Sequence, residues 1–395
     1  MSMPKIFSED MVGAPVLNGV AGSLISLLDA CLVYGFGLKS ADSVTVSGGI
    51  ATMNFSSGHS FRAHSIALVA GATPSVINGE QRILSTTTTT ATFATSAPDG
   101  TATGAITAKV APLGWTKVFT GTNKAVYKAS APEASGAFLR VDDTGVSGGA
   151  NTARVRMYEV MTDVDTGINP APADGRVVGG GLYWIKAWSS SANSVRWALV
   201  GDDRTFYFAP MPYSQIASSA TVSGVWGFGD LISYRSGDPY PGFLTGDSVE
   251  FNGNANATLG YAAGDGDSST QLMRPVSGIG NSVPAARRAL TGSGSSGADS
   301  AMGRYPCPAN NGLLLTQITL GQMPMSTNGP RGVVPGALYV PQTGTNSGQF
   351  PRGSIIDGTG AFVGKKIYSI PTTTAISDSS DDRAFFFDLT GPWRE

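Results

Sequence analysis

The segment from Leu113 to Pro210 places the strongest constraint on the fold of this 395-residue chain. Within it, polar and apolar residues alternate in short runs that are rich in β-branched and aromatic residues. Clusters of Gly, Asp, Asn and Ser separate the runs. The clearest runs are Ala153–Thr162, Leu182–Trp188, Val195–Val200 and Thr205–Ala209. A two-residue period bounded by turn residues is typical of half-buried strands. We therefore predict a β-sheet here that carries the fold.

The composition favours strands and excludes some classes of function. The chain contains 52 Gly residues, which disfavour helices and suit short strands joined by tight turns. Charged residues make up only 14%, the net charge is −2, and Lys and Arg form no cluster. We therefore expect no nucleic-acid partner, because phosphate binding needs such clusters. An ordered chain with so little charge often buries surface against copies of itself, so we expect a homo-oligomer.

Residues 1–39 are predicted to form an extended arm followed by one helix. The arm, residues 1–15, has no core of its own, so we expect it to reach a neighbouring subunit. Apolar residues then recur at helical spacing from Leu17 to Leu32, and Gly35 and Gly37 should end the helix. A helix this apolar must be buried, either in the core of the main domain or, alternatively, against another subunit.

The same apolar segment raises the question of a membrane span. Between Val12 and Leu38 it is interrupted by Asn, Ser, Asp and Gly residues, so it lacks a continuous apolar stretch of about 18 residues. Glu9 and Asp10 precede it, where a signal peptide would carry positive charge. We expect neither a transmembrane helix nor an export signal.

Residues 40–110 are predicted to form a small β module. Six short strand-like runs lie within about 70 residues, which suits a small sandwich or barrel. Turn pairs such as Gly48-Gly49 and Asn78-Gly79 separate them. The Thr86–Thr90 run should be an edge strand or the tip of a hairpin.

The module carries several recognisable sequence elements. They are Gly58-His59-Ser60-Phe61, Ile77-Asn78-Gly79-Glu80, and a Thr-rich stretch that leads into Phe93-Ala94. With these elements, residues 43–108 resemble a module that is scattered through virion proteins of tailed bacteriophages. The sequence departs from that pattern at Arg62-Ala63-His64, where the pattern has Gly-Asp, and at Ser60, where it has Gly.

The remaining chain divides into three predicted regions. Residues 111–250 should form the main β domain, with a long loop at Gly167–Gly181 that contacts neighbours. Residues 251–303 are a Gly/Ser-rich excursion of loops. Residues 304–395 should complete the main domain, with the aromatic strand Ala384–Leu389 at its centre. The predicted fold is mainly β, with a sandwich- or barrel-like main domain, one N-terminal helix and a small inserted β domain.

Few residues could take part in catalysis or bind a metal, and we predict no catalytic, cofactor or metal site. The two histidines, His59 and His64, should lie in turns or at the surface. The Asp-rich sequences lack the Glu that closes an EF-hand loop and are interpreted as turns; they are Asp142-Asp143, Asp163–Gly167, Gly264–Ser268 and Asp381-Asp382. Gly179-Gly180-Gly181 lacks the Lys-Ser/Thr of a phosphate loop.

Aromatic and cysteine residues are assigned to the core. The aromatic set could line a sugar groove, but packing of a sheet explains it better; it comprises Tyr183, Trp184, Trp188, Trp197, Phe206, Tyr207 and Phe208. Cys31 and Cys307 are interpreted as buried thiols of a chain that folds in a reducing cytoplasm.

The sequence therefore predicts a structural protein and no enzyme. The segments Arg331–Pro341 and Asp388–Arg394 extend the resemblance to phage structural proteins over most of the chain. The resemblance implies a subunit of the virion, in the tail or baseplate, that contacts copies of itself and other virion proteins. Two alternatives stay open: a tail protein that binds a receptor or a host-surface glycan, and a head-decoration or connector protein. A depolymerase is disfavoured because no coil-by-coil repeat is present.

Overall fold

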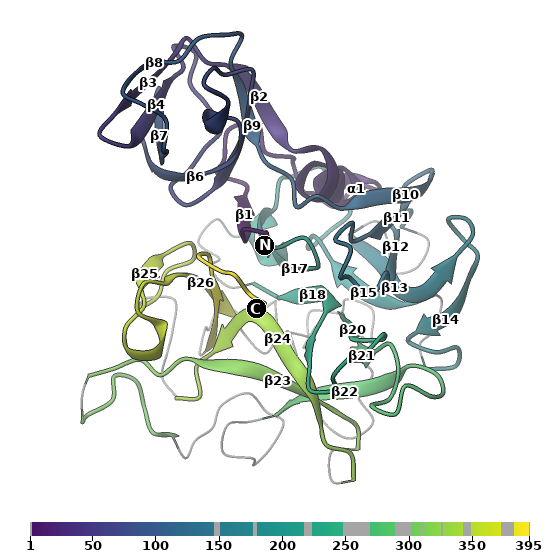
Figure 1. Ribbon diagram of the computed structural model, residues 1–395. Helices are drawn as coiled ribbons and strands as arrows, with labels where there is room; N and C mark the ends of the chain where they lie inside the picture. The colour runs from purple at the N-terminus through teal and green to yellow at the C-terminus, as the bar shows by residue number, and fades with distance from the viewer. Residues whose placement is uncertain are drawn as a thin grey trace.

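The computed structural model describes residues 2–145, 151–176, 180–216, 223–247, 269–288, 302–309, 311–324, 327–342, 349–372 and 383–394. The mainly-β prediction is confirmed: antiparallel sheets dominate, and only one α-helix occurs in these ranges. Figure 1 shows a small β module at the top, a helix beneath it and a larger body below.

The module is an eight-stranded sheet that curls around its own core, with strand order β2-β9-β5-β6-β7-β4-β3-β8. Val44, Met53, Val69, Ile83 and Phe93 are buried inside it. The Thr86–Thr90 run is the tip of a hairpin, as predicted. The strands are β2 (Phe36–Ser40), β3 (Ser43–Ser47), β4 (Ile50–Asn54), β5 (Ile66–Ala70), β6 (Gly79–Thr86), β7 (Thr90–Ala94), β8 (Gly100–Thr101) and β9 (Thr107–Val110), with a 3-10 turn at Ser75–Ile77.

A second sheet, of six strands, forms one side of the body (Figure 1). Its inner face is apolar because alternate residues of each strand point into the core, as Val155 and Met157 do. The strands are β10 (Thr116–Gly121), β11 (Lys124–Lys128), β12 (Phe138–Asp142), β13 (Thr152–Met161), β14 (Gly167–Ala171) and β15 (Leu182–Ile185).

The third sheet has thirteen strands and collects segments from both ends of the chain, in the order β1-β16-β17-β18-β20-β21-β22-β23-β24-β27-β26-β25, with β19 beside β24. Its strands are β1 (Lys5–Ser8), β16 (Arg196–Gly201), β17 (Thr205–Met211), β18 (Trp226–Asp230), β19 (Ile232–Ser233), β20 (Gly242–Thr245), β21 (Thr270–Leu272), β22 (Val283–Arg288), β23 (Thr316–Gln322), β24 (Pro330–Tyr339), β25 (Ile355–Asp357), β26 (Lys366–Thr372) and β27 (Arg383–Asp388). Short 3-10 turns occur at Pro212–Gln215 and Gly360–Phe362. The aromatic strand β27 lies between β24 and β26, so its predicted central position is confirmed.

Strand β17 separates two cores. Phe206 and Phe208 pack against Trp115 and Trp184 on the side of the six-stranded sheet. Tyr207 faces the other way and packs against Phe387 and Trp393. Because both faces of this strand are covered, its sequence is a continuous aromatic run rather than a strict alternation.

The structure corrects the prediction that Leu113–Pro210 forms one sheet. Strands β10 to β15 belong to the six-stranded sheet, whereas β16 and β17 belong to the thirteen-stranded sheet. The predicted loop Gly167–Gly181 is also partly wrong, because it begins with strand β14, which pairs with β13. Periodicity shows which face of a strand is buried, but it does not show which strand lies beside it.

The N-terminal region differs from its prediction in two ways. The expected arm contains strand β1, which pairs with β16 of the same chain and buries Phe7 completely. The α-helix, α1, spans only Ser23–Leu28 and continues as a π-helix over Asp29–Tyr34. Leu17 instead forms a bridge to Val195. Gly35 ends the helical segment with a φ of 71°, as predicted, and the helix is buried in the chain's own core.

Residues 251–303 are described only in part. The prediction of a loop excursion is partly wrong, because β21 and β22 lie in this region and pair within the thirteen-stranded sheet. Leu272 and Met273 are buried, whereas Val276 and Ile279 are exposed. The sequences Gly264–Ser268 and Asp381-Asp382 lie outside the described residues, as does Gly179.

Candidate functional site

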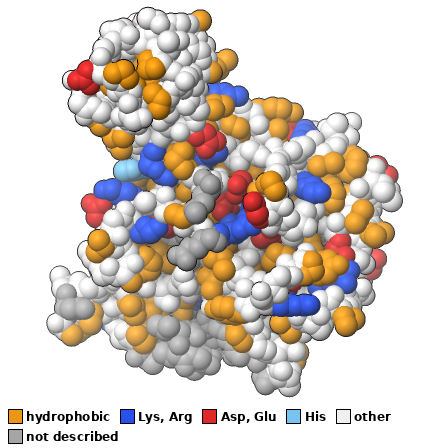
Figure 2. All heavy atoms as spheres, viewed as in Figure 1, with side chains coloured by type: hydrophobic (Ala, Val, Ile, Leu, Met, Phe, Trp, Pro, Cys, Tyr) orange, Lys and Arg blue, Asp and Glu red, His pale blue; other side chains and the backbone are white. Residues whose placement is uncertain are grey.

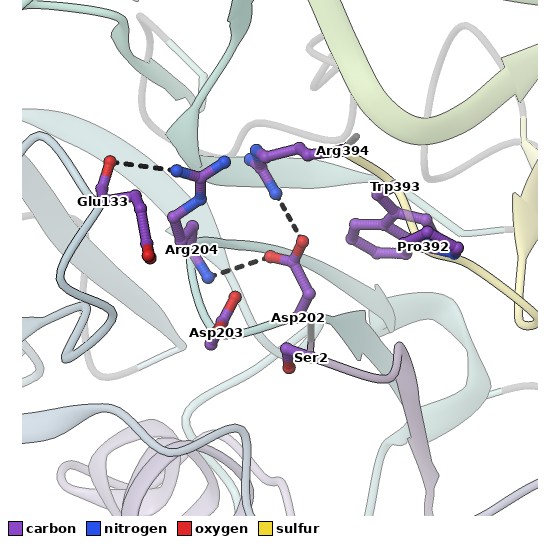
Figure 3. A pocket seen from close by; sticks show the side chains of 8 residues that line it. All are labelled: Ser2, Glu133, Asp202, Asp203, Arg204, Pro392, Trp393 and Arg394. Carbon is purple, nitrogen blue, oxygen red and sulfur yellow. Dashed lines mark hydrogen bonds and ion pairs between the residues drawn. The ribbon is translucent and has the colours of Figure 1, made fainter.

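A cavity of about 290 Å³ lies where four distant segments meet (Figure 3). The turn between β16 and β17 forms one side with Asp202, Asp203 and Arg204. Ser2, Glu133 and the segment Pro392–Arg394 form the rest of the wall. No single stretch of sequence contains this set, so sequence reasoning could not have assembled it.

Arg394 holds the C-terminal segment in place. Its guanidinium forms an ion pair with Asp202. It also donates hydrogen bonds to Thr205 Oγ1 at 2.5 Å and to the carbonyl oxygen of Asp230 at 2.6 Å. The other carboxylate oxygen of Asp202 accepts the backbone N–H groups of Arg204 and Thr205. Asp202 is therefore fully engaged in joining the chain end to the sheet.

Asp203 is the more buried of two carboxylates in this cavity with unused hydrogen-bonding capacity; the other, Glu133, is exposed. Among the described residues, no side chain forms a hydrogen bond or ion pair with Asp203. Burial raises the pKa of Asp203, and the neighbouring charge of Asp202 raises it further. Two adjacent carboxyl groups in different environments are an arrangement that acid–base sites also use. The cavity therefore offers two free carboxyl groups, Asp203 and Glu133, and one partly used cation, Arg204, which donates to the backbone carbonyl oxygen of Glu133.

Trp393 limits what this cavity can bind. Its ring lies directly over Gly336, and its Nε1 donates to the carbonyl oxygen of Asp388 at 2.7 Å. Only 7% of the residue is exposed, so its ring face is not a free platform for a sugar. The described residues contain no group of three or more His, Cys, Asp or Glu side chains that could hold a metal ion.

A second region of interest is the outer face of the six-stranded sheet, defined here by Phe119, Val126, Phe138, Tyr158, Val160 and Ile168. Val160 and Ile168 are directly opposite each other on β13 and the edge strand β14. Both are exposed, Ile168 by 59%. The apolar cluster on this face draws on residues 119–164; Val126 and Tyr158 within it are buried, so Val160 and Ile168 are its exposed part.

Cationic side chains lie across the aromatic rings of this outer face. Lys128 Nζ is 4.7 Å from the centre of the Phe138 ring, and Arg156 Cζ is 5.7 Å from that of Tyr158. Such contacts shield apolar surface while the charge remains in water. Arg and aromatic residues are also enriched at protein–protein interfaces.

The two histidines occupy different environments. His59 is buried in the module: its Nε2 lies 2.9 Å from the carbonyl oxygen of Thr90, and its Nδ1 accepts the N–H of Phe61. The prediction of a turn or surface position is wrong for this residue, which lies in the loop between β4 and β5 with its side chain buried. His64 lies in a turn with a φ of 68° and is half-buried. Neither is placed with the partners of a catalytic triad.

The other predicted residues have structural roles. The aromatic set is buried in the core, except for the half-buried Trp188, as packing predicted. Asp163 accepts the N–H groups of Asp165 and Thr166, which is the geometry of a turn. Cys31 is a buried free thiol, as predicted, whereas Cys307 is free and half-buried.

The buried ion pair between Asp143 and Lys186 was missed by sequence reasoning. Both side chains are inaccessible to solvent, and Nζ lies 2.5 Å from Oδ1. The other oxygen of Asp143 accepts the N–H of Leu24 at the start of α1. Burial raises the pKa of Asp143 to about 6, although Lys186 opposes the shift. A signal was present: Lys186 interrupts the apolar run Leu182–Trp188, and a buried Lys needs a partner.

The sequence matches no known protein-family model and no curated protein. Within the described ranges, no helix has both the length and the apolar character needed to cross a bilayer.

Proposed function

We propose that the chain is a structural subunit of a tailed-bacteriophage virion, in the tail or baseplate, and that it acts through contacts with copies of itself and with other virion proteins. The observation that carries the proposal is the outer face of the six-stranded sheet. It combines aromatic residues and Arg, which are enriched at protein–protein interfaces, with exposed aliphatic residues at an edge strand. The resemblance of residues 43–108 to a phage virion module supports the assignment to a virion.

The mechanism would be assembly by burial of surface. Permanent contacts of this kind usually bury more than about 2,000 Å². The outer face alone is too small for that, so neighbouring loops and further patches would take part. Val160 and Ile168 would contribute the apolar centre, and the cations over the rings would form its rim.

The contact can be tested with a charge placed at its centre. We expect the purified wild-type chain to form a homo-oligomer, measured by light scattering and native mass spectrometry. Ile168→Asp should shift it toward monomer, because a carboxylate would lose its hydration in the contact. Val363→Asp is the matched control, since Val363 is 74% exposed on another part of the body.

Several outcomes would contradict the proposal. If Ile168→Asp assembles like the wild type while keeping its unfolding midpoint, the outer face is not the contact. If the wild type is a stable monomer that degrades polysaccharide, the structural role itself is wrong. Antibody labelling of whole virions, viewed by electron microscopy, separates a tail position from head decoration or a connector.

A second candidate is a tail protein that binds a host-surface glycan, and the cavity at Asp203 favours it. The free carboxylate of Asp203 can accept hydrogen bonds from sugar hydroxyls, and the guanidinium of Arg204 can donate to them. We expect Asp203→Asn to weaken binding on a glycan array about 10-fold or more if the cavity is the site, because hydrogen bonds to charged groups contribute about 1.5–3 kcal/mol. Binding that is the same in this variant and the wild type would remove the cavity from consideration.

A further inference from the structure

The module and the body meet through polar contacts on the side of β25 and β26. Arg82 donates to the carbonyl oxygens of Leu389 and Thr390. Arg62 donates to Ser8 Oγ at 2.8 Å and lies 5.5 Å from the centre of the Tyr368 ring. Figure 2 shows the surface hollowed between module and body on this side, with a His side chain among Lys and Arg side chains.

The opposite side of the junction carries both chain crossings, and the ion pair between Lys5 and Glu80 lies beside the exit, where Lys5 also donates to the carbonyl oxygen of Pro112. The chain enters the module at Gly35–Gly37 and leaves it after Val110. Phe36 packs there against Phe7 of the body, with ring centres 6.3 Å apart. Gly35 and Gly37 both have positive φ, 71° and 69°, which is a conformation that only glycine adopts easily. Gly35 and Gly37 could therefore act as a hinge on this side, and the contacts on the polar side, at β25 and β26, are the ones that could open.

His64 lies on the polar side, at the centre of the charged groups. Its backbone N–H donates to the carbonyl oxygen of Ile83 at 2.8 Å, so the module holds the residue in place. The charged groups that face the ring are Lys366 of β26, Arg82 of β6 and Arg62 of its own turn, opposed by Asp357 of β25. No described residue forms a hydrogen bond with the ring.

These surroundings oppose a positive charge on His64. Burial lowers its pKa, and the charges of Lys366 and Arg82 lower it further. When the contact opens, the ring gains water and moves away from Lys366, so it binds a proton more readily. By linkage, the open form is favoured as the pH falls below the ordinary histidine pKa of about 6.5. The closed form is favoured when the imidazole is neutral.

We propose that protonation of His64 opens the contact between the module and the β25–β26 edge, so that the module swings about Gly35–Gly37 in mildly acidic solution. A single proton changes the ratio of open to closed forms by at most about tenfold per pH unit. The inference does not depend on the proposed virion role.

Distances between two spin labels in the full-length chain test this directly. The labels are placed at Thr88→Cys on the module tip and Val363→Cys on the body, in a Cys307→Ser background, because Cys31 is buried and does not react. Pulsed spin-resonance measurements compare samples at about pH 7.5 and about pH 5.5. We expect a longer-distance population to grow at the lower pH.

Two variants identify the titrating group. His64→Asn is neutral and tolerates positive φ, so its distances should be the same at both pH values. Lys366→Gln keeps His64 but removes the charge that opposes its protonation most strongly, so its acid-induced change should be smaller than in the wild type. It also serves if His64→Asn fails to fold. A wild-type distance that does not change, or a pH response that persists in His64→Asn, would overturn the proposal.

Discussion

At the scale of single residues, a buried ion pair orders part of the protein's interior. Asp143 and Lys186 are fully buried and link the start of α1 to strand β15. Lys186 also donates to the carbonyl oxygen of Val20 and to Ser23 Oγ. Removing two charges from water is expensive, so such a pair orders its surroundings more than it adds net stability.

Breaking this pair should be far more damaging than replacing it. We expect Asp143→Ala to lower the free energy of unfolding by about 3–5 kcal/mol, because Lys186 would stay buried without its partner. The double variant Asp143→Leu/Lys186→Met should recover most of the loss. Urea unfolding followed by circular dichroism measures both.

The control is an ion pair at the surface. Asp174 pairs with Arg156, and its side chain is 88% exposed. Asp174→Ala should therefore cost at most about 1 kcal/mol. Equal losses for Asp143→Ala and Asp174→Ala would mean that the buried pair has no special role.

At the scale of secondary-structure elements, strand β1 changes the interpretation of the N-terminal segment. Its sequence, Lys-Ile-Phe-Ser, is too short for a clear period, so sequence reasoning treated it as part of an arm. In the structure it pairs with β16, and Lys5 forms an ion pair with Glu80 of the module. The segment therefore stabilises its own chain, and it ties the module to the body.

If β1 stabilises its own chain, truncating its buried side chain should destabilise the isolated subunit. Phe7→Ala should lower the free energy of unfolding by about 3–5 kcal/mol, as expected for a large aromatic residue removed from a core. Val12→Ala is the control, because Val12 is 66% exposed and its truncation should cost under about 0.5 kcal/mol. If Phe7→Ala reduced assembly but left the unfolding of the monomer unchanged, the arm interpretation would be restored.

At the scale of the whole molecule, the cavity, the largest sheet and the junction between module and body are each formed by segments far apart in the sequence. The cavity unites Ser2, Glu133, Asp202 and Arg394. The thirteen-stranded sheet places β1 and β27 in one surface with β17 between two cores. The junction around His64 brings together the module, β1 and the last strands. Each contact proposed above, with a second copy, a glycan or a proton, therefore depends on how the three sheets are positioned.

The amino-acid sequence by itself determined the class of structure and most of its strands. Short runs bounded by turn residues predicted six of the eight strands of the module, β16, β17 and β27, because such runs report which side chains are buried. Gly35 predicted the end of the helical segment, because a positive φ is a local property of the backbone.

Only the tertiary structure decided which strands are neighbours, and therefore where the sites lie. Periodicity is a property of one strand, whereas pairing depends on the fit of surfaces far apart in sequence. The division of Leu113–Pro210 between two sheets, the pairing of β1 with β16 and the partner of Lys186 all depend on that fit. The effect of a charge on stability or function depends on its distance to the next charge, and only the fold sets that distance.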